Sequence, residues 1–233
     1  MKYYEKGSLQ NIIYKDKKFR WSIEFVHGIL TDLAVALQAM HERGIVHNDI
    51  KVIQWSLLQH IIVLVLQPGN VLVDYDRRTK KFTALVCDFS ISYIHDDELM
   101  GVKAMRRSNV KGASTSYAPP EIFVQKHRNG KRKKMKSPFP VDIYSFGITA
   151  YEALSRRPPW RNMEKDEIKA AVIDGKRPEF PLDIERLKQS NALVRVLIGI
   201  IAECWSQSAS DRPSAASLVR QMKRLAEFKP PEK

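Results

Sequence analysis

Glycine is scarce in this sequence, and its placement excludes one kind of nucleotide site. The 233 residues include ten glycines, and no two of them are separated by a single residue. The sequence therefore has no G-x-G loop, the element whose backbone amides closely approach the phosphates of a nucleotide. Any nucleotide site within these residues must be built without such a loop.

Cysteine is also scarce, which excludes a disulfide-stabilised scaffold. Cys87 and Cys204 are the two cysteines of the chain, and each lies in an apolar run. This pattern predicts reduced, buried thiols in an intracellular protein. Residues 1–10 contain no apolar core of the kind that signal peptides need, so we expect a cytoplasmic location.

Long hydrophobic runs are missing too. The longest mostly apolar stretch covers residues 52–67, in which eleven of sixteen side chains are Val, Ile, Leu or Trp. A membrane-spanning helix needs about 20 apolar residues, so we expect no transmembrane segment. The stretch needs another explanation, which its flanking residues provide.

Acidic residues are outnumbered, 26 against 39 Lys and Arg, which gives a net charge of +13. Residues 126–136 (KHRNGKRKKMK) carry seven of these cations. Such a run can direct a protein to the nucleus, or bind RNA, anionic lipid or an acidic protein surface. Because the run has no aromatic residue on which a base could stack, we favour a solvated basic loop. Nuclear location and a nucleic-acid or acidic partner through residues 126–136 remain the alternatives.

Helical periodicity dominates the rest of the sequence. Apolar residues at three- and four-residue steps predict a helix over residues 21–43, ended by Gly44. Residues 141–154 are apolar on nearly every side, which predicts a helix buried in the core. Two more helices are predicted over residues 164–173 and 191–206. A last helix is predicted to run to about residue 228, with Pro213 in its first turn and Ser210 or Asp211 as its cap.

Little β-structure is predicted. Residues 71–73 and 84–86 are short β-like runs separated by a polar turn, which indicates a small hairpin. We interpret residues 90–117, which have little periodicity, as a long loop. The expected fold class is therefore mainly α with a small β-hairpin pair, and residues 229–233 form a tail.

The flanks of the apolar stretch form a continuous motif once the stretch is removed. HNDIK (47–51) then joins PGNVLVD (68–74), followed by DFS from Asp88 and PPE from Pro119. This series resembles the catalytic loop, magnesium loop and activation segment of eukaryotic protein kinases, H-R-D-x-x-x-x-N, D-F-G and A-P-E. Three more segments extend the resemblance over essentially the whole chain. MKYYEKGSLQNII resembles the kinase hinge and the helix that follows it, and VDIYSFG resembles the start of the central buried helix. ECWSQSASDRPS resembles the segment with the arginine that pairs with the A-P-E glutamate.

The segments GSL (7–9), ECW (203–205) and DRPS (211–214) are similar to those of the tyrosine-kinase-like branch of Ser/Thr kinases. The resemblance implies one protein kinase domain over residues 1–228, with the hinge and the large C-terminal lobe. It also implies transfer of the ATP γ-phosphate to Ser or Thr of a protein substrate, with ATP and Mg²⁺ as cofactors.

By the same resemblance, four residues carry the chemistry. Asp49 is the base that accepts the proton of the substrate hydroxyl, and Lys51 contacts the transferring phosphate of ATP. Asn70 and Asp88 hold Mg²⁺ through oxygen donors. The set Lys51, Asn70 and Asp88 therefore binds the cofactors.

Three further matched residues are expected to be structural. The resemblance implies that Asp142 braces the catalytic loop by accepting backbone hydrogen bonds. It also implies that Glu121 and Arg212 form the ion pair that ties the activation segment to the helical core.

Several residues depart from the family pattern. Asn48 replaces the family arginine, which argues against switching by a phosphorylated activation loop. Ser90 replaces the glycine of D-F-G. No V-A-I-K strand precedes the hinge-like residues, so we expect that the N-terminal β lobe is absent and that this chain is a truncated form of low activity. The alternative is an inactive pseudokinase or scaffold fragment that binds protein partners.

The apolar stretch, residues 52–67, is the remaining departure, and we interpret it as a non-native insertion. Valine codons begin with GT and glutamine can be encoded by CAG. A stretch that starts with Val52 and ends with Gln67 therefore fits an unspliced, in-frame intron. The alternative is a genuine helix or hairpin beside the active site that binds a partner.

Overall fold

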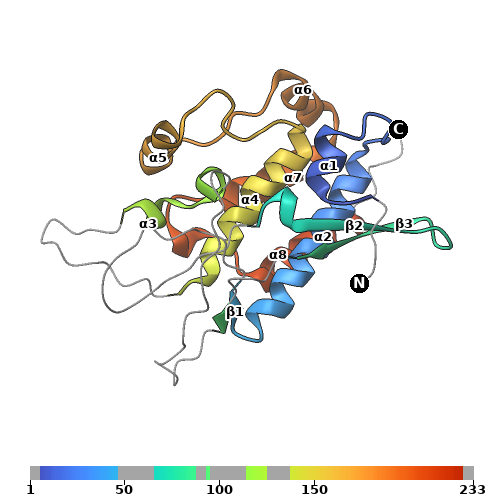
Figure 1. The fold of residues 1–233 in the computed structure, drawn as a ribbon, viewed down its shortest axis with the longest axis horizontal. Helices are drawn as coiled ribbons and strands as arrows, with labels where there is room; N and C mark the ends of the chain where they lie inside the picture. The colour runs from blue at the N-terminus through green and yellow to red at the C-terminus, as the bar shows by residue number, and fades with distance from the viewer. Residues whose placement is uncertain (1–5, 47–65, 88–92, 95–113, 125–136, 228–233) are drawn as a thin grey trace, which may run out of the picture.

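The computed structural model describes residues 6–46, 66–87, 93–94, 114–124 and 137–227. In this part of the chain most residues are helical, and the strands form two antiparallel pairs. The predicted fold class, mainly α with a small β-hairpin, is therefore confirmed. Figure 1 shows the long helices α2 (Ile23–His41) and α4 (Phe139–Ser155) in the middle of the molecule.

The apolar stripe predicted over residues 21–43 forms α2. The Ser22 side chain accepts a hydrogen bond from the Phe25 amide (3.1 Å), which fixes the start of the helix. In the described part of the chain, α2 is the one helix that is long and apolar enough to cross a membrane. Because its stripe is buried against α4 and α8 (Ala215–Glu227), as in a core helix, this is a weak indication of a membrane span.

α4 is buried along nearly its whole length. Every residue from position 141 to position 155 is buried, as the apolar sequence predicts. Gly147 faces α7 (Ala192–Cys204), where a Cβ atom would lie 2.9 Å from the Cβ of Cys204. The absence of a side chain at Gly147 thus allows the two helices to contact each other closely.

The remaining helices surround this core. They are α1 (Leu9–Tyr14), α3 (Pro120–Phe123), α5 (Lys165–Ile173), α6 (Leu182–Ser190), and the short 3-10 turns η1 (Pro68–Asn70), η2 (Ser114–Tyr117) and η3 (Ala209–Asp211). α5 begins with a capping box between Glu164 and Glu167, close to its predicted start. α6 was not predicted, because Ile184 is its one buried residue and the rest of its sequence has no apolar stripe.

The predicted start of the last helix is wrong. α8 begins at Ala215, and the side chain of Ser214 accepts the amide hydrogen of Ser217 (3.2 Å). Ser210 and Asp211 lie instead in η3, and Arg212 has an extended backbone. The cause is Pro213, because its ring disfavours a helical conformation in the residue before it.

The predicted hairpin is longer than expected. Strand β2 (Val71–Asp76) pairs with β3 (Lys81–Val86), with Val71 opposite Val86 and Asp76 opposite Lys81. The carboxylate of Asp32 on α2 accepts the amide hydrogen of Ala84 (2.9 Å), which fastens the hairpin to the helix. Burial raises the pKa of Asp32, and this hydrogen bond opposes the rise.

The interpretation of residues 90–117 as a loop is wrong at two places. Tyr93–Ile94 form β4, which pairs with β1 (Ile45–Val46), and η2 forms over Ser114–Tyr117. Elements of two to four residues are too short to show a period in the sequence.

Candidate functional site

Four polar side chains form one buried stripe along α4. Asp142, Ser145, Thr149 and Glu152 are separated by three, four and three residues, the spacing that places side chains on one face of a helix. All four are buried. Because a buried polar group is costly without a hydrogen-bond partner, each of them requires a partner, either within α4 or from another part of the chain. We call this set the polar stripe.

Asp142 contacts the C-terminal end of α2. Its Oδ2 atom lies 2.9 Å from Nε2 of His41, and Asp142 is fully buried. The ring of His41 also contacts that of Phe139, with 4.6 Å between the centroids. This contact fixes the end of α2, from which the chain continues towards the predicted base Asp49.

Thr149 contacts the chain just before η1. Its hydroxyl donates a hydrogen bond of 2.5 Å to the backbone carbonyl of Leu66, and the Leu66 side chain is fully buried. The Gln67 carbonyl then accepts the Asn70 amide (2.9 Å), which closes η1. The position of Asn70 is therefore set from α4.

Glu152 joins α1 to η2. The hydroxyl of Tyr14 on α1 donates to Glu152 Oε1 (2.6 Å), and the hydroxyl of Tyr117 at the end of η2 donates to Oε2. Burial raises the pKa of Glu152, while the two tyrosine hydroxyls oppose the rise. Burial and the neighbouring Glu152 carboxylate raise the pKa of both tyrosines, so that both remain donors.

The segment around η2 and α3 is held at several points. Trp160 Nε1 donates to the Ser116 carbonyl (2.9 Å). The Ser145 hydroxyl lies within hydrogen-bond distance of the Tyr117 carbonyl (3.3 Å) and of the Val141 carbonyl in its own helix (3.0 Å). This segment belongs to the predicted activation segment. Contacts from two distant parts of the chain thus fix its path.

Arg212 and Glu121 form a two-bonded ion pair. Arg212 Nη1 and Nη2 donate to the two carboxylate oxygens of Glu121 at 2.6 and 2.8 Å. Arg212 also donates to the carbonyls of Pro140 and Ser206, each at 3.0 Å. Its guanidinium lies 5.0 Å from the ring centroid of Tyr144, whose burial raises its pKa to about 12. The pair joins α3 to the segment after η3, and the bond from Arg212 to Pro140 connects this segment to the start of α4.

The open end of the β2–β3 hairpin brings two predicted positions together. Asn70 precedes β2 and Cys87 follows β3, and the Cys87 amide donates to the Asn70 carbonyl (2.9 Å). Asn70 is buried, with 7% of its surface exposed. Cys87 directly precedes Asp88 in the sequence.

The predicted catalytic residues Asp49 and Lys51 and the predicted metal ligand Asp88 lie outside the described residues. Residues 52–65 of the apolar stretch and the basic run 126–136 lie outside them too. Within the described residues there is no group of three metal-ligating His, Cys, Asp or Glu side chains. The backbone groups that Asp142 was predicted to bind, in the loop that contains Asp49, also lie outside.

The structure describes the last two residues of the apolar stretch, and both belong to the core region beside η1. Leu66 and Gln67 directly precede Pro68, whereas the uninterrupted motif would place Ile50 and Lys51 there. Leu66 fills a fully buried apolar position. In this chain the neighbour of Pro68 is therefore the neutral Gln67 rather than the cation Lys51.

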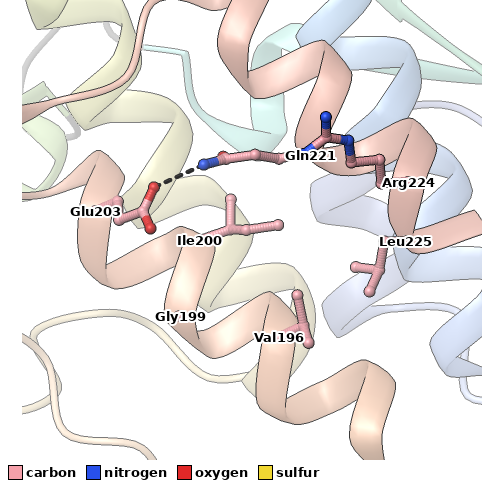
Figure 2. Close-up of a pocket in the computed structure, with 7 residues that line it drawn as sticks. All are labelled: Val196, Gly199, Ile200, Glu203, Gln221, Arg224 and Leu225. Carbon is pink, nitrogen blue, oxygen red and sulfur yellow. Dashed lines mark hydrogen bonds between the residues drawn. The ribbon is translucent and has the colours of Figure 1, made fainter. Parts of the chain in front are cut away.

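A hollow between α7 and α8 lies apart from these residues. Figure 2 shows its lining, with a hydrogen bond from Gln221 Nε2 to Glu203 Oε2 (2.8 Å) that joins the two helices. The lining residues are Val196, Gly199, Ile200, Glu203, Gln221, Arg224 and Leu225. None of them was predicted to carry chemistry, so we place the candidate site around the polar stripe and the hairpin end.

Sequence reasoning missed most of the polar stripe and its partners. Only Asp142 was singled out, whereas Ser145, Thr149, Glu152 and His41 were not. A signal was present, because polar residues at helical spacing inside an otherwise apolar helix predict buried hydrogen bonds. Their partners on other segments could not be read from that spacing.

Comparisons with known proteins agree with the motif order. A model of the family described as protein tyrosine and serine/threonine kinase matches residues 1–222. Similar curated proteins include a probable LIM domain-containing serine/threonine-protein kinase of Dictyostelium discoideum (26% identical over 222 residues), the dual specificity protein kinase zakA of the same organism (27% over 203 residues) and the serine/threonine-protein kinase CTR1 of Arabidopsis thaliana (25% over 233 residues).

These similarities cover most of this chain but a small part of each relative. They include 95%, 82% and 96% of this chain, and 27%, 20% and 22% of the three relatives, respectively. The chain thus spans about a quarter of the length of these three relatives.

Proposed function

The chain belongs to the family of protein tyrosine and serine/threonine kinases, and from this premise we propose that it transfers the γ-phosphate of ATP to Ser or Thr of protein substrates. The observation that carries the proposal is the hydrogen bond that holds Asn70 beside Cys87, the residue before Asp88. The names of the three relatives, which are Ser/Thr or dual specificity kinases, support the choice of acceptor.

Phosphoryl transfer depends mainly on positioning and on neutralising charge. In our proposal, Asn70 and Asp88 hold Mg²⁺ with an amide and a carboxylate oxygen. When bound, Mg²⁺ neutralises charge on the phosphates of ATP. Asp49 orients the substrate hydroxyl and accepts its proton, and Lys51 contacts the transferred phosphate.

The polar stripe would supply the rigidity that this chemistry needs. Catalytic groups must be held to within about 0.5 Å of their productive positions. Thr149 fixes the chain before Asn70, and Asp142 fixes the end of α2, which leads to Asp49. Glu152 holds Tyr117, two residues before the PPE motif that contains Glu121.

A second candidate function is an inactive scaffold that binds protein partners. The observation in its favour is the neutral Gln67 beside Pro68, where the uninterrupted motif has Lys51. Loss of that cation would remove a contact to the transferring phosphate. We therefore propose that this chain has low activity and that a form without residues 52–67 is more active.

The deciding experiment is a phosphotransfer assay with radiolabelled ATP, Mg²⁺ and a mixed library of Ser, Thr and Tyr peptides. We expect label on Ser and Thr peptides, lost in Asp49→Asn and retained in the matched control Asp174→Asn, an exposed aspartate after α5. Absence of transfer by both the chain and the form without residues 52–67 would refute the kinase proposal and support the scaffold.

A narrower test addresses Gln67. The substitution Gln67→Lys restores a cation beside Pro68, and we expect it to raise the phosphotransfer rate of the full chain. Gln189→Lys, which adds the same charge at an exposed position in α6, is the control and should leave the rate unchanged. An equal effect of both substitutions would show that net charge alone is responsible.

A further inference from the structure

A positively charged surface lies on two segments that are far apart in the sequence. One segment connects α1 to α2, and the other is the turn of the β2–β3 hairpin, at the end away from Asn70 and Cys87. Seven Lys and Arg side chains on these two segments are exposed. These cations are Lys15, Lys17, Lys18 and Arg20 between α1 and α2, and Arg78, Lys80 and Lys81 at the hairpin turn. We call this set the basic edge.

Aromatic rings hold the two segments together. The Phe19 ring contacts the Phe82 ring, with 5.4 Å between centroids, and Phe25 contacts both at 4.7 and 5.1 Å. All three contacts are edge-to-face, the arrangement that aromatic pairs prefer. Because Phe19 lies between Lys18 and Arg20 and Phe82 follows Lys81, the two sets of cations have a fixed relative position.

The nearby carboxylates are used by the backbone. Asp16 accepts the Lys18 amide (3.2 Å), and Asp76 accepts the amides of Arg78 (2.8 Å) and Thr79 (3.3 Å). The ion pairs found between described residues include none of the seven cations of the basic edge. The positive charge of this surface is therefore available to a partner.

We propose that the basic edge binds an acidic segment of a partner protein, independently of the proposed phosphotransfer. Figure 1 shows that the hairpin reaches out beyond the helices, so a flat bilayer would meet its tip first. The aromatic rings pack on one another and are half-buried, which leaves no platform for stacking bases. Five of the seven cations are lysines, which act as point charges without the forked geometry with which arginine grips phosphate. An extended acidic peptide can follow both segments of the edge.

The test uses the full chain and a fluorescein-labelled peptide of four Glu-Glu-Leu repeats, with binding measured by fluorescence anisotropy. We expect binding that weakens as salt is added, because exposed charges are screened. Lys17→Glu with Lys18→Glu should weaken binding at least about tenfold, and Arg78→Glu with Lys81→Glu should do the same. The matched control is Arg161→Glu with Lys165→Glu, which changes the net charge equally around α5 and should leave the affinity within about twofold.

Several results would overturn the proposal. Equal losses in the control and in the two edge variants would show that net charge alone governs binding, and survival of binding in both edge variants would assign it to residues 126–136. Tighter binding of a 20-nucleotide dT strand, or of vesicles with one-fifth phosphatidylserine, would assign the edge to another class of partner. If a charge-reversed variant fails to fold, the Lys17→Gln and Lys18→Gln pair replaces it, with Arg161→Gln and Lys165→Gln as its control.

Discussion

Helices α4 and α8 differ in where their polar side chains lie. In α4 the polar stripe is buried and faces other segments, whereas in α8 Arg220, Lys223 and Arg224 are exposed. The inner face of α8 is apolar instead, and consists of Leu218, Val219, Met222 and Leu225. Both helices lie against the same core, and the fully buried polar residues among the described side chains of the two helices belong to α4.

The difference shows what a buried polar side chain can do that an apolar one cannot. Apolar contacts are non-directional, so several arrangements of α8 would bury the same surface. A buried hydroxyl or carboxylate has to meet a particular partner in a particular geometry. The polar stripe of α4 therefore fixes α1, the end of α2, the start of η1 and η2 relative to one another.

Removing the buried charge of Arg212, which contacts the start of α4, should have the largest effect. Arg212→Gln leaves Glu121 and the Pro140 carbonyl without their partner, and loss of one member of a buried ion pair costs about 3–5 kcal/mol. Arg220→Gln on the exposed face of α8 should change the free energy of unfolding by less than about 0.5 kcal/mol. Chemical denaturation of both variants measures the contrast, and similar losses would contradict it.

A smaller effect is expected where α4 meets α7. Gly147→Ala places a Cβ atom 2.9 Å from Cβ of Cys204, and overfilling of this kind costs about 1–3 kcal/mol. The matched change Gly199→Ala on α7 meets no atom within 4 Å. It should stabilise the protein by about 0.5–1 kcal/mol, because alanine favours a helix over glycine. Thermal unfolding compares the two, and a loss in both would show that helix contact is not the cause.

Thr149→Val should cost about 1–1.5 kcal/mol, because the buried Leu66 carbonyl loses a hydrogen bond while the side-chain shape is kept. The control is Thr31→Val, since the Thr31 hydroxyl donates to the His27 carbonyl within its own helix (2.8 Å). That change should cost less than about 0.5 kcal/mol. If the phosphotransfer rate falls in Thr31→Val as much as in Thr149→Val, the hydrogen bond of Thr149 does not position Asn70 for catalysis.

The smallest expected signal is a change of pH dependence at Glu152. Burial raises the pKa of Glu152 above its usual 4.5, so the folded protein holds this proton more tightly than the unfolded chain does. The contribution of Glu152 to the free energy of unfolding should then decrease as the pH rises from about 4.5 through the raised pKa. The free energy of unfolding of Glu152→Gln should lack this slope. The difference in this free energy between wild type and variant should therefore shrink with rising pH. A constant difference in urea denaturation across this range would contradict the assignment.

The sequence predicted much of the fold, because its long elements carry strong periodic signals. α2 differs from its prediction by two residues at each end, since its apolar stripe and Ser22 cap are local features. α6 and β4 were missed, because α6 lacks an apolar stripe and β4 has only two residues. The start of α8 was placed wrongly because Pro213 acts on the residue before it.

The candidate site was predicted less completely. The partnership of Glu121 and Arg212 came from motif order, and the structure places the two in contact. The contacts of Thr149 with Leu66 and of Glu152 with Tyr14 join residues more than 80 positions apart. Neither propensity nor spacing carries information over that separation, so only the folded chain reveals those partners.

The central claim, that polar side chains of α4 hold distant segments in place, is tested most directly by a double-mutant cycle between Tyr117 and Glu152. Tyr117→Phe, Glu152→Met and the double variant are compared by their free energies of unfolding in urea. We expect a coupling of about 0.5–3 kcal/mol between the two positions, and additivity within about 0.5 kcal/mol for Tyr117→Phe with Arg220→Gln. Additive losses at Tyr117 and Glu152 would contradict the claim.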